Sequence, residues 1–272
     1  MNNFKKTIPK VLNLFDVSLR DSLQTWKRVP SLDEKKYILK NIVKKTPSKK
    51  VELGSIVSPK ILPQFVDSIE LYHYCRKKYR FMEPYLLIPN LKMHEIALHN
   101  KIENMSFITS VSEEFQIKNT KMTLQESKEQ IKKMINKTPG KTKIYISCIN
   151  ECPIKGIIPT QDIITEITDY AKLPIDELCL SDTCGTIDVN IFRNIISQIS
   201  HKLEINNKCR SLLSVHLHKN KNENITKNII NFCLEEQIFN FDVSCIQGGG
   251  CSVTMDSNKT NDNLNYYHFE DN

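Results

Sequence analysis

The chain has 272 residues, of which 40% are hydrophobic and 25% charged, and its formal net charge is +7. This composition is that of a soluble globular protein, and no apolar run approaches the roughly 18 to 20 residues that span a bilayer. The 38 basic residues are dispersed along the chain, so we expect a solvated, lysine-rich surface and neither a nucleic-acid nor a membrane partner.

The chain ends and the cysteines indicate a reducing compartment. Residues 1–10 lack the apolar core and the cleavage site of a signal peptide, and the last three residues match no prenylation or peroxisomal signal. Nine cysteines are present, an odd number without a small-domain framework, which favours free thiols. We therefore expect a cytoplasmic protein in which most cysteines are small buried hydrophobic residues.

Short apolar, β-rich runs alternate with longer segments of helical periodicity. Strands are predicted at 11–17, 50–53, 85–88, 105–110, 143–148, 177–180, 212–217 and 239–244. Helices are predicted at 32–44, 60–78, 91–100, 124–136, from about 160, and at 189–203 and 223–236. Ser31, followed three residues later by Glu34, is the expected N-cap of the first helix, and Thr160 that of the fifth.

Eight strands, each preceding a helical stretch, are typical of parallel βαβ units. The predicted fold class is therefore α/β, a closed TIM (β/α)8 barrel forming a single domain over 1–272. An open doubly wound sheet is the alternative, but the chain has no glycine-rich dinucleotide fingerprint and no P-loop. Only 259–269 are left for the last helix, so we expect it to be shortened or irregular, with 252–272 as a short irregular tail.

Ionisable side chains gather where the predicted strands end, which is the face that carries the active site in such barrels. They come from strands one, two, six, seven and eight, and are Arg20, Asp21, Glu52, Asp182, His216, His218 and Cys251. The convergence of residues this far apart in sequence carries more weight than any single motif. The other histidines (His73, His94, His99, His201 and His268) fall on helices or the tail and are expected at the surface.

His216 and His218 are the most informative pair. Residues i and i+2 of a strand point to the same face, so both imidazoles can aim at one point. With the carboxylate of Asp21 they would form a site for a divalent metal that keeps open positions for substrate. The His-x-His pattern alone is weak, and its place opposite Arg20 and Asp21 is what favours the metal site over buried or surface histidines.

Each of the other candidates also has an ordinary structural interpretation. Arg20 can stabilise an anionic oxygen or simply pair with Asp21. Glu52 can orient a ligand or be a satisfied core carboxylate, and Asp182 can cap the following helix. Three glycines place Cys251 on a mobile loop, where its thiol can exchange a proton or be inert.

An ordered series of motifs resembles the HMG-CoA lyase family of the DRE-TIM metallolyases, which have a pyruvate carboxyltransferase-like barrel. FDVSLRDSLQ at 15–24 is similar to the superfamily signature D-x-x-x-R-D-x-L-Q. The lyase-like segments that follow are VELGSIVSPK at 51–60, PNLK at 89–92, SEEF at 112–115, YISC at 145–148, CP at 152–153, SDTCG at 181–185, VHLH at 215–218 and GGC at 249–251. The resemblance covers roughly 11–267.

The resemblance implies a set of residue roles. Asp21, His216, His218 and, from the last loop, Asn258 would bind Mg²⁺ or Mn²⁺, and Gln24 and Ser55 are assigned to cofactor binding. Arg20 would hold an enolate oxygen, Glu52 and Asp182 would orient ligands and relay protons, His216 or Asp182 would act as base, and Cys251 would act in proton transfer. The implied reaction cleaves 3-hydroxy-3-methylglutaryl-CoA, or a related 3-hydroxyacyl-CoA, to acetyl-CoA and acetoacetate by retro-Claisen chemistry.

The chain also departs from the family. After His218 the family usually continues with Asp-Thr-Tyr-Gly, whereas this chain has Lys219-Asn220-Lys221-Asn222, which would put a lysine beside the metal. We also expect the C-terminal helices that help to cover the CoA end in the family to be absent. Two alternatives therefore stay open, a condensing enzyme of the 2-isopropylmalate or homocitrate synthase type and a non-catalytic binding scaffold. The sequence allows a homodimer but does not specify one.

Overall fold

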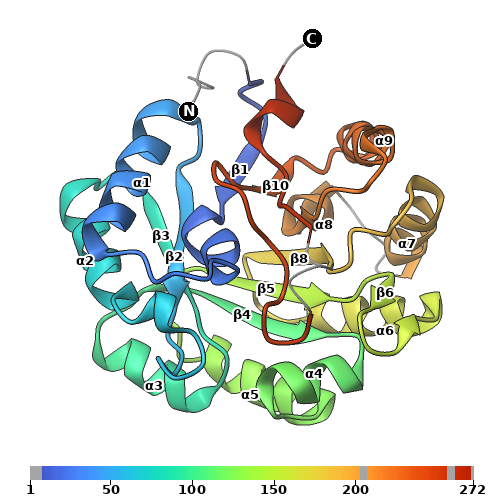
Figure 1. The fold of residues 1–272 in the computed structure, drawn as a ribbon. Coiled ribbons are helices and arrows are strands. Elements are labelled where there is room, and N and C mark those ends of the chain that lie inside the picture. The colour runs from blue at the N-terminus through green and yellow to red at the C-terminus, as the bar shows by residue number, and fades with distance from the viewer. Residues whose placement is uncertain (1–7, 203–206, 256–260, 271–272) are drawn as a thin grey trace.

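Eight parallel strands close into a barrel (Figure 1). The computed structural model describes residues 8–202, 207–255 and 261–270. Around the barrel the order is β1-β10-β9-β8-β5-β4-β3-β2, and the strands are β1 (Asn13–Asp16), β2 (Lys50–Ser55), β3 (Glu83–Leu87), β4 (Asn104–Ser110), β5 (Thr142–Ser147), β8 (Glu177–Asp182), β9 (Leu213–Leu217) and β10 (Asn240–Val243). β6 (Glu151–Cys152) and β7 (Gly156–Ile157) form a separate antiparallel hairpin. The predicted TIM barrel is confirmed, and all eight predicted strands contribute to it.

Helices surround the barrel on its outer face (Figure 1). They are α1 (Leu32–Lys45), α2 (Ser68–Lys78), α3 (Leu91–His99), α4 (Glu113–Thr120), α5 (Leu124–Ile135), α6 (Thr160–Ala171), α7 (Val189–Lys202), α8 (Asn207–Leu212) and α9 (Glu223–Glu235). Three shorter helical turns are η2 (Ser18–Ser22), η3 (Pro63–Phe65) and η4 (Tyr266–Phe269). The turn after β1, η2, is a π-turn, a form that is frequent at functional sites.

Local sequence signals explain the helix starts, with some corrections. The predicted capping box of α1 is present, because Ser31 Oγ accepts from the Glu34 N–H and Glu34 accepts from the Ser31 N–H. The helix predicted at 60–78 begins only at Ser68, after the Pro63 turn. Thr160 is not a cap, since Pro159 takes the N-cap position. The helices α4 and α8 were not predicted.

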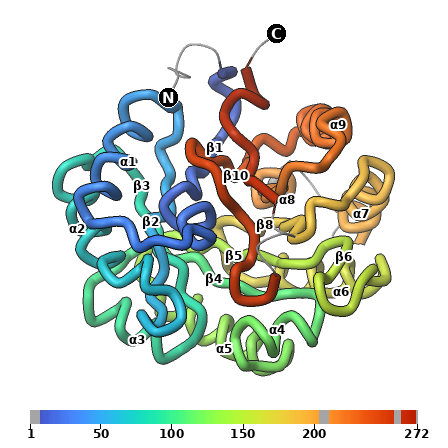
Figure 2. The backbone as a smooth tube through the Cα atoms, in the orientation of Figure 1, coloured from blue at the N-terminus to red at the C-terminus, as the bar shows by residue number. Residues whose placement is uncertain are grey.

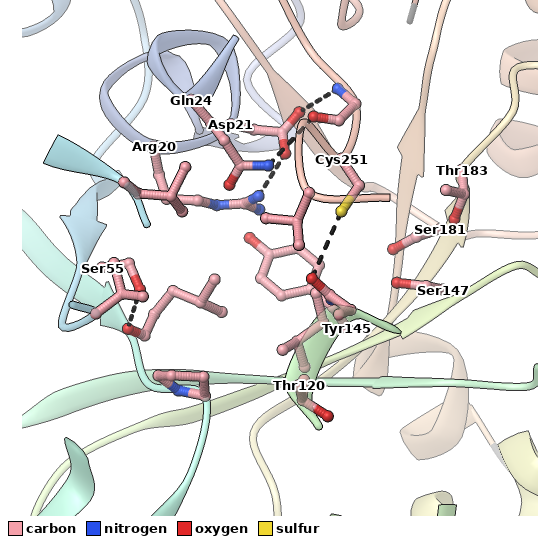
Figure 3. Close-up of a pocket in the computed structure, with 18 of the residues that line it drawn as sticks. Arg20, Asp21, Gln24, Ser55, Thr120, Tyr145, Ser147, Ser181, Thr183 and Cys251 are labelled. Carbon is pink, nitrogen blue, oxygen red and sulfur yellow. Dashed lines mark hydrogen bonds and ion pairs between the residues drawn. The ribbon is translucent and has the colours of Figure 1, made fainter. Parts of the chain in front are cut away.

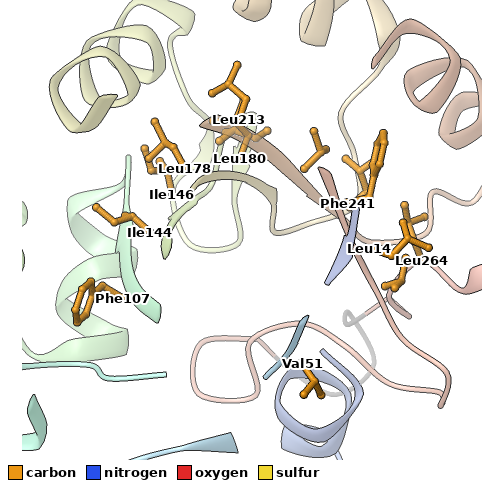
Figure 4. Packing of buried hydrophobic residues seen from close by; sticks show 14 of the residues in the cluster. Leu14, Val51, Phe107, Ile144, Ile146, Leu178, Leu180, Leu213, Phe241 and Leu264 are labelled. Carbon is orange, nitrogen blue, oxygen red and sulfur yellow. The ribbon is translucent and has the colours of Figure 1, made fainter. Parts of the chain in front are cut away.

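The main apolar core lies between the strands and the helices (Figure 4). It takes alternate strand residues, such as Leu14, Ile144, Leu178, Leu180, Leu213 and Phe241. The barrel interior holds two small clusters, one of Phe15, Val17 and Tyr85 and one of Leu87, Tyr145 and Cys179. Charged side chains share this interior. Lys143, for example, is 0% exposed. The expectation that the lysines lie on the surface is therefore wrong for this residue.

The segment after β10 crosses the mouth of the barrel instead of continuing into a long helix (Figure 2). It bridges to Ser244 through Asn265 and to His218 through Asn263. The described part of the chain then ends just after η4, where the ring centroids of Phe269 and Phe241 lie 4.9 Å apart. A short helical turn therefore stands where the eighth helix of a complete barrel would lie, as the length of the tail predicted.

Candidate metal centre at the barrel mouth

Three predicted ligands meet at one point. Asp21 lies in η2, while His216 belongs to β9 and His218 directly follows that strand. His218 Nε2 lies 3.5 Å and His216 Nε2 3.7 Å from Asp21 Oδ2. One ligand atom from each residue lies within 4.8 Å of those of the other two, and all three residues are buried. The alternation of β9 and the turn after β1 thus bring the expected side chains together.

Hydrogen bonds define which nitrogen of each histidine is free. His216 Nδ1 lies 3.0 Å from Asp242 Oδ2, and His218 Nδ1 lies 2.9 Å from the carbonyl oxygen of Asp182. A carboxylate and a carbonyl only accept, so in the neutral imidazoles both Nδ1 atoms carry the proton. Both Nε2 lone pairs therefore face Asp21, which is the arrangement that metal-ligating histidines adopt.

Two buried atoms at this point lack hydrogen-bond partners. Within the described part of the chain, these are His218 Nε2 and Asn263 Oδ1. The Asn263 amide nitrogen donates to Asp21 Oδ2 at 3.0 Å, so this side chain lies beside the three ligands. A buried polar atom without a partner is costly. Two imidazoles, a carboxylate and an amide oxygen fit the donors that Mg²⁺ or Mn²⁺ takes, which makes a divalent cation the matching occupant.

Charges around the centre set its protonation. Burial alone would raise the pKa of Asp21, but the Arg20 guanidinium and the two imidazoles hold it well below its ordinary value. Burial lowers the pKa of His216. Burial also opposes protonation of His218, but the Asp21 carboxylate outweighs it and raises that pKa. At neutral pH, Asp21 is ionised and His216 neutral, as metal binding requires.

Arg20 is fixed beside the centre by two carboxylates. Its NH1 atom pairs with Asp21 and its Nε with Glu52. The guanidinium carbon lies 5.0 Å from the centroid of the Tyr145 ring, and the Tyr145 hydroxyl donates to Glu52 at 3.1 Å. Glu52 is fully buried and orients Arg20 rather than a metal ligand. Arg20 therefore forms the ordinary ion pair with Asp21, and the same side chain is the candidate cation for an anionic oxygen.

The glycine-rich loop after β10 has backbone angles that other residues rarely adopt. Gly248, Gly249 and Gly250 have φ values of +119°, +157° and +87°. A Cβ on Gly249 would approach the Asn263 nitrogen to 2.9 Å. The bend allows the Gly250 N–H to donate to Asp21 Oδ2 at 3.1 Å. The loop is therefore part of the wall around the centre.

Cys251 follows this bend and reaches the same cavity. Its Sγ lies 3.5 Å from Asn119 Oδ1 on α4, and Figure 3 shows the side chain above the Tyr145 ring. Burial raises the pKa of the Cys251 thiol. The thiol is therefore protonated at neutral pH, which suits a proton donor better than a nucleophile.

Some of the remaining predicted residues line the cavity and others do not. Gln24 and Ser55 line the cavity, where the Gln24 amide donates to the Gly250 carbonyl at 3.3 Å and the Ser55 hydroxyl to the Leu87 carbonyl at 2.8 Å. The Asp182 carboxylate instead accepts backbone N–H groups of the loop that follows β8. Among the described residues, neither Asp182 nor Glu52 lines the cavity.

The cavity above the centre is lined by polar residues over one part of its wall and by apolar residues over the other. Figure 3 shows Arg20, Asp21 and Gln24 on one side of it and Ser147, Ser181 and Thr183 on the other. The apolar lining comes from the loops and strand ends of β2, β3 and β4, from α4 and from the last loop, and consists of Val57, Ile61, Leu62, Leu87, Pro89, Ile108, Phe115 and Val253. Such a cavity suits a ligand with a charged head and a carbon-rich body.

Asn258, the predicted fourth ligand, lies outside the described residues. Its placement as a ligand therefore stays a prediction. Among the described residues, Asn263 lies beside the centre through its contact with Asp21.

Lys219 does not point its charge at the centre. Its Nζ lies 5.3 Å from the centroid of the Tyr267 ring, while its backbone N–H donates to the Asp262 carbonyl at 2.7 Å.

A second expectation, that His94 is a surface residue, is wrong. His94 is 1% exposed and its Nε2 lies 3.1 Å from Thr138 Oγ1.

Two residues of the site were missed by sequence reasoning. Asp242 holds His216, and Tyr145 supports Arg20 and Glu52. Both lie inside predicted strands, and the sequence assigned neither of them a role in the site. A carboxylate within an otherwise apolar strand is rarely buried without a partner, and that pattern was the available signal for Asp242.

These features define an α/β barrel with a candidate metal centre at its mouth. Across the described part of the chain, no helix is both long and apolar enough to cross a membrane. A model of the HMGL-like family matches residues 11–229. The chain belongs to this HMG-CoA lyase family of the DRE-TIM superfamily.

Individual relatives are similar at low identity. The mitochondrial hydroxymethylglutaryl-CoA lyase of Macaca fascicularis is 25% identical over 248 residues, which are 90% of this chain and 74% of that protein. A 3-hydroxy-3-isohexenylglutaryl-CoA/hydroxymethylglutaryl-CoA lyase of Pseudomonas aeruginosa is 26% identical over 247 residues, 90% of this chain and 79% of its own. The crystal structure of hydroxymethylglutaryl-CoA lyase from P. aeruginosa superposes with a TM-score of 0.81 at 25% identity, covering 95% of this chain and 83% of that one.

Proposed function

We propose that the chain is a divalent-metal-dependent lyase that cleaves 3-hydroxy-3-methylglutaryl-CoA to acetyl-CoA and acetoacetate, or a related 3-hydroxyacyl-CoA to acetyl-CoA and the corresponding carbonyl product. The observation that carries the proposal is the meeting of Asp21, His216 and His218 with their free acceptor atoms facing one point. The names of the relatives, all lyases of such thioesters, support the same chemistry.

Asp21, His216, His218 and Asn263 would hold the cation. When bound, Mg²⁺ or Mn²⁺ would lower the pKa of a coordinated C3 hydroxyl, so that a weak base suffices to remove its proton. The Nε2 lone pair of His216 is then occupied, and the Asp182 carboxylate is turned into its own loop. We therefore assign neither residue the role of base: the hydroxyl proton would pass to solvent water in the open cavity, and the same solvent would later return a proton to Cys251. Asp182 would hold His218 through its carbonyl.

Arg20 and Cys251 would act on the departing acetyl-CoA. The C2–C3 cleavage leaves negative charge on the thioester enolate, and Arg20 lines the cavity as a fixed cation for that oxygen. The Cys251 thiol, neutral and facing the same cavity, would donate its proton to the enolate carbon. Glu52 and Tyr145 would keep Arg20 in place.

The test is acetoacetate release from 3-hydroxy-3-methylglutaryl-CoA with Mg²⁺ or Mn²⁺, measured for the wild type beside Arg20→Gln and His216→Ala. We expect metal-dependent release that falls to background in His216→Ala, because the centre loses a ligand. A folded wild type that binds the metal but cleaves no acyl-CoA would refute the lyase proposal and leave a binding scaffold. Acceptance of acetyl-CoA and a 2-oxo acid instead would identify a condensing enzyme.

A further inference from the structure

A row of polar and charged side chains passes through the barrel interior behind the candidate metal centre. It runs from His216 through Asp242 and Lys143 to Glu177 and Lys50, which lie on five different strands. Asp242 accepts from His216 Nδ1 at 3.0 Å and pairs with Lys143. Glu177 lies 2.8 Å from Lys143 Nζ and 3.0 Å from Lys50 Nζ. Branched apolar side chains usually fill such an interior, so this row requires a reason.

The Lys143–Asp242 part of the row is shielded from solvent. Lys143 is 0% and Asp242 1% exposed, and the Lys143 ammonium lies 4.0 Å from the centroid of the Phe15 ring and 4.8 Å from that of Tyr145. Moving two charges out of water is unfavourable, and apolar replacements of such pairs are often as stable. Stability alone is therefore a weak explanation for the pair.

The two oxygens of Asp242 serve different partners. Oδ1 pairs with Lys143 Nζ, and Oδ2 faces His216 Nδ1. An ammonium can only donate, so the atom of residue 242 that faces Lys143 must be an acceptor. The other oxygen is thereby presented to His216, where it accepts the Nδ1 proton and leaves Nε2 without one.

We propose that the Lys143–Asp242 pair is a positioning element that fixes the tautomer of His216 and so creates the second imidazole ligand of the metal centre. This rests on the proposed metal site, but it does not require the lyase reaction. Lys143 acts at a distance, since it touches Asp242 and not His216. Lys143 determines which atom of the residue-242 side chain faces His216.

Asp242→Asn tests this asymmetry with a side chain of nearly the same shape. Lys143 would hold the amide oxygen of the new residue, which turns the amide NH₂ group toward His216 Nδ1. His216 would then have to accept at Nδ1 and carry its proton on Nε2, where it can no longer bind a cation. We expect Mn²⁺ binding to weaken on the order of 10- to 100-fold, as for other changes to residues that orient a metal ligand.

The double variant Lys143→Met, Asp242→Asn gives the opposite expectation. Without the ammonium, the amide is free to turn its oxygen toward His216, which restores the proton on Nδ1. The double variant should therefore bind Mn²⁺ more tightly than Asp242→Asn alone. A merely structural pair predicts the reverse, because two disruptions of the interior should do more harm than one.

Two measurements decide the matter without substrate, namely free Mn²⁺ by electron paramagnetic resonance and the His216 ¹⁵N shifts of the metal-free proteins. We expect the proton on Nδ1 in the wild type and the double variant, and on Nε2 in Asp242→Asn. Lys35→Met is the matched control, since Lys35 is also buried and paired, with Asp67, and should leave both readouts unchanged. A wild-type His216 that carries its proton on Nε2, or a double variant that binds no better than the single one, would overturn the proposal. Absent lyase activity would not affect these readouts.

Discussion

The two halves of the barrel mouth are built from different kinds of side chain. The half formed by β1, β5, β8 and β9 carries the guanidinium, carboxylate, imidazoles and hydroxyls, whereas the half formed by β2, β3 and β4 is mainly apolar. The polar half is also fixed from behind by buried partners such as Asp242 and Glu52. We therefore predict that catalysis and the binding of the apolar part of a ligand can be altered separately in this chain.

The largest expected effect comes from the polar half. Arg20→Gln should reduce kcat about 10²- to 10³-fold, because a fixed donor for the enolate oxygen is lost. Mn²⁺ affinity should not fall, since a positive charge next to Asp21 has been removed. Steady-state kinetics and a Mn²⁺ titration of the same preparation check both parts. Loss of metal binding would show that Arg20 only supports the centre.

Cys251→Ala should have a smaller effect, a decrease in kcat on the order of 10²-fold with unchanged metal affinity, because a proton donor is removed. Cys245→Ala is the control, as Cys245 is half-buried like Cys251 but does not line the cavity. Full activity of Cys251→Ala, or an equal loss in both variants, would remove the thiol from the mechanism.

The apolar half should respond in substrate binding only. Ile61 lines the cavity and is 59% exposed, so Ile61→Asn should fold normally. We expect KM for the acyl-CoA to rise roughly 3- to 10-fold, corresponding to about 1 kcal/mol of lost apolar burial, with kcat and Mn²⁺ affinity unchanged. A change in kcat alone would contradict the division between the halves.

The smallest effect on activity is expected at Asp16, which lies five residues before Asp21 but outside the mouth. Burial raises the pKa of Asp16 to about 6, although Tyr266 and Ser18 donate to it. The folded state therefore binds this proton more tightly than the unfolded chain. The resulting stability is complete below the ordinary carboxyl pKa and is lost as pH rises through about 6.

Urea unfolding across pH tests this directly. The wild type should gain about 2 kcal/mol relative to Asp16→Asn between pH 7 and pH 4, because its pKa is shifted by about two units, while the two activities stay similar at neutral pH. If both proteins respond to pH alike, the Asp16 carboxyl titrates normally in the fold.

The sequence predicted the barrel and much of the candidate site for physical reasons. Parallel strands need apolar runs of limited length, and the alternation of a strand places His216 and His218 on one face. Long-range partners were less accessible. Asp242 and Lys143 look like ordinary strand residues until closure of the barrel places them together, and the path of the last loop decides that Asn263 reaches Asp21.

The metal centre is tested most directly by anomalous diffraction from crystals grown with Mn²⁺. The account predicts one anomalous peak bounded by Asp21, His216, His218 and Asn263, and no peak at this place in a His216→Ala crystal. An empty centre in the wild type at saturating Mn²⁺, with the ion bound elsewhere or not at all, would contradict it.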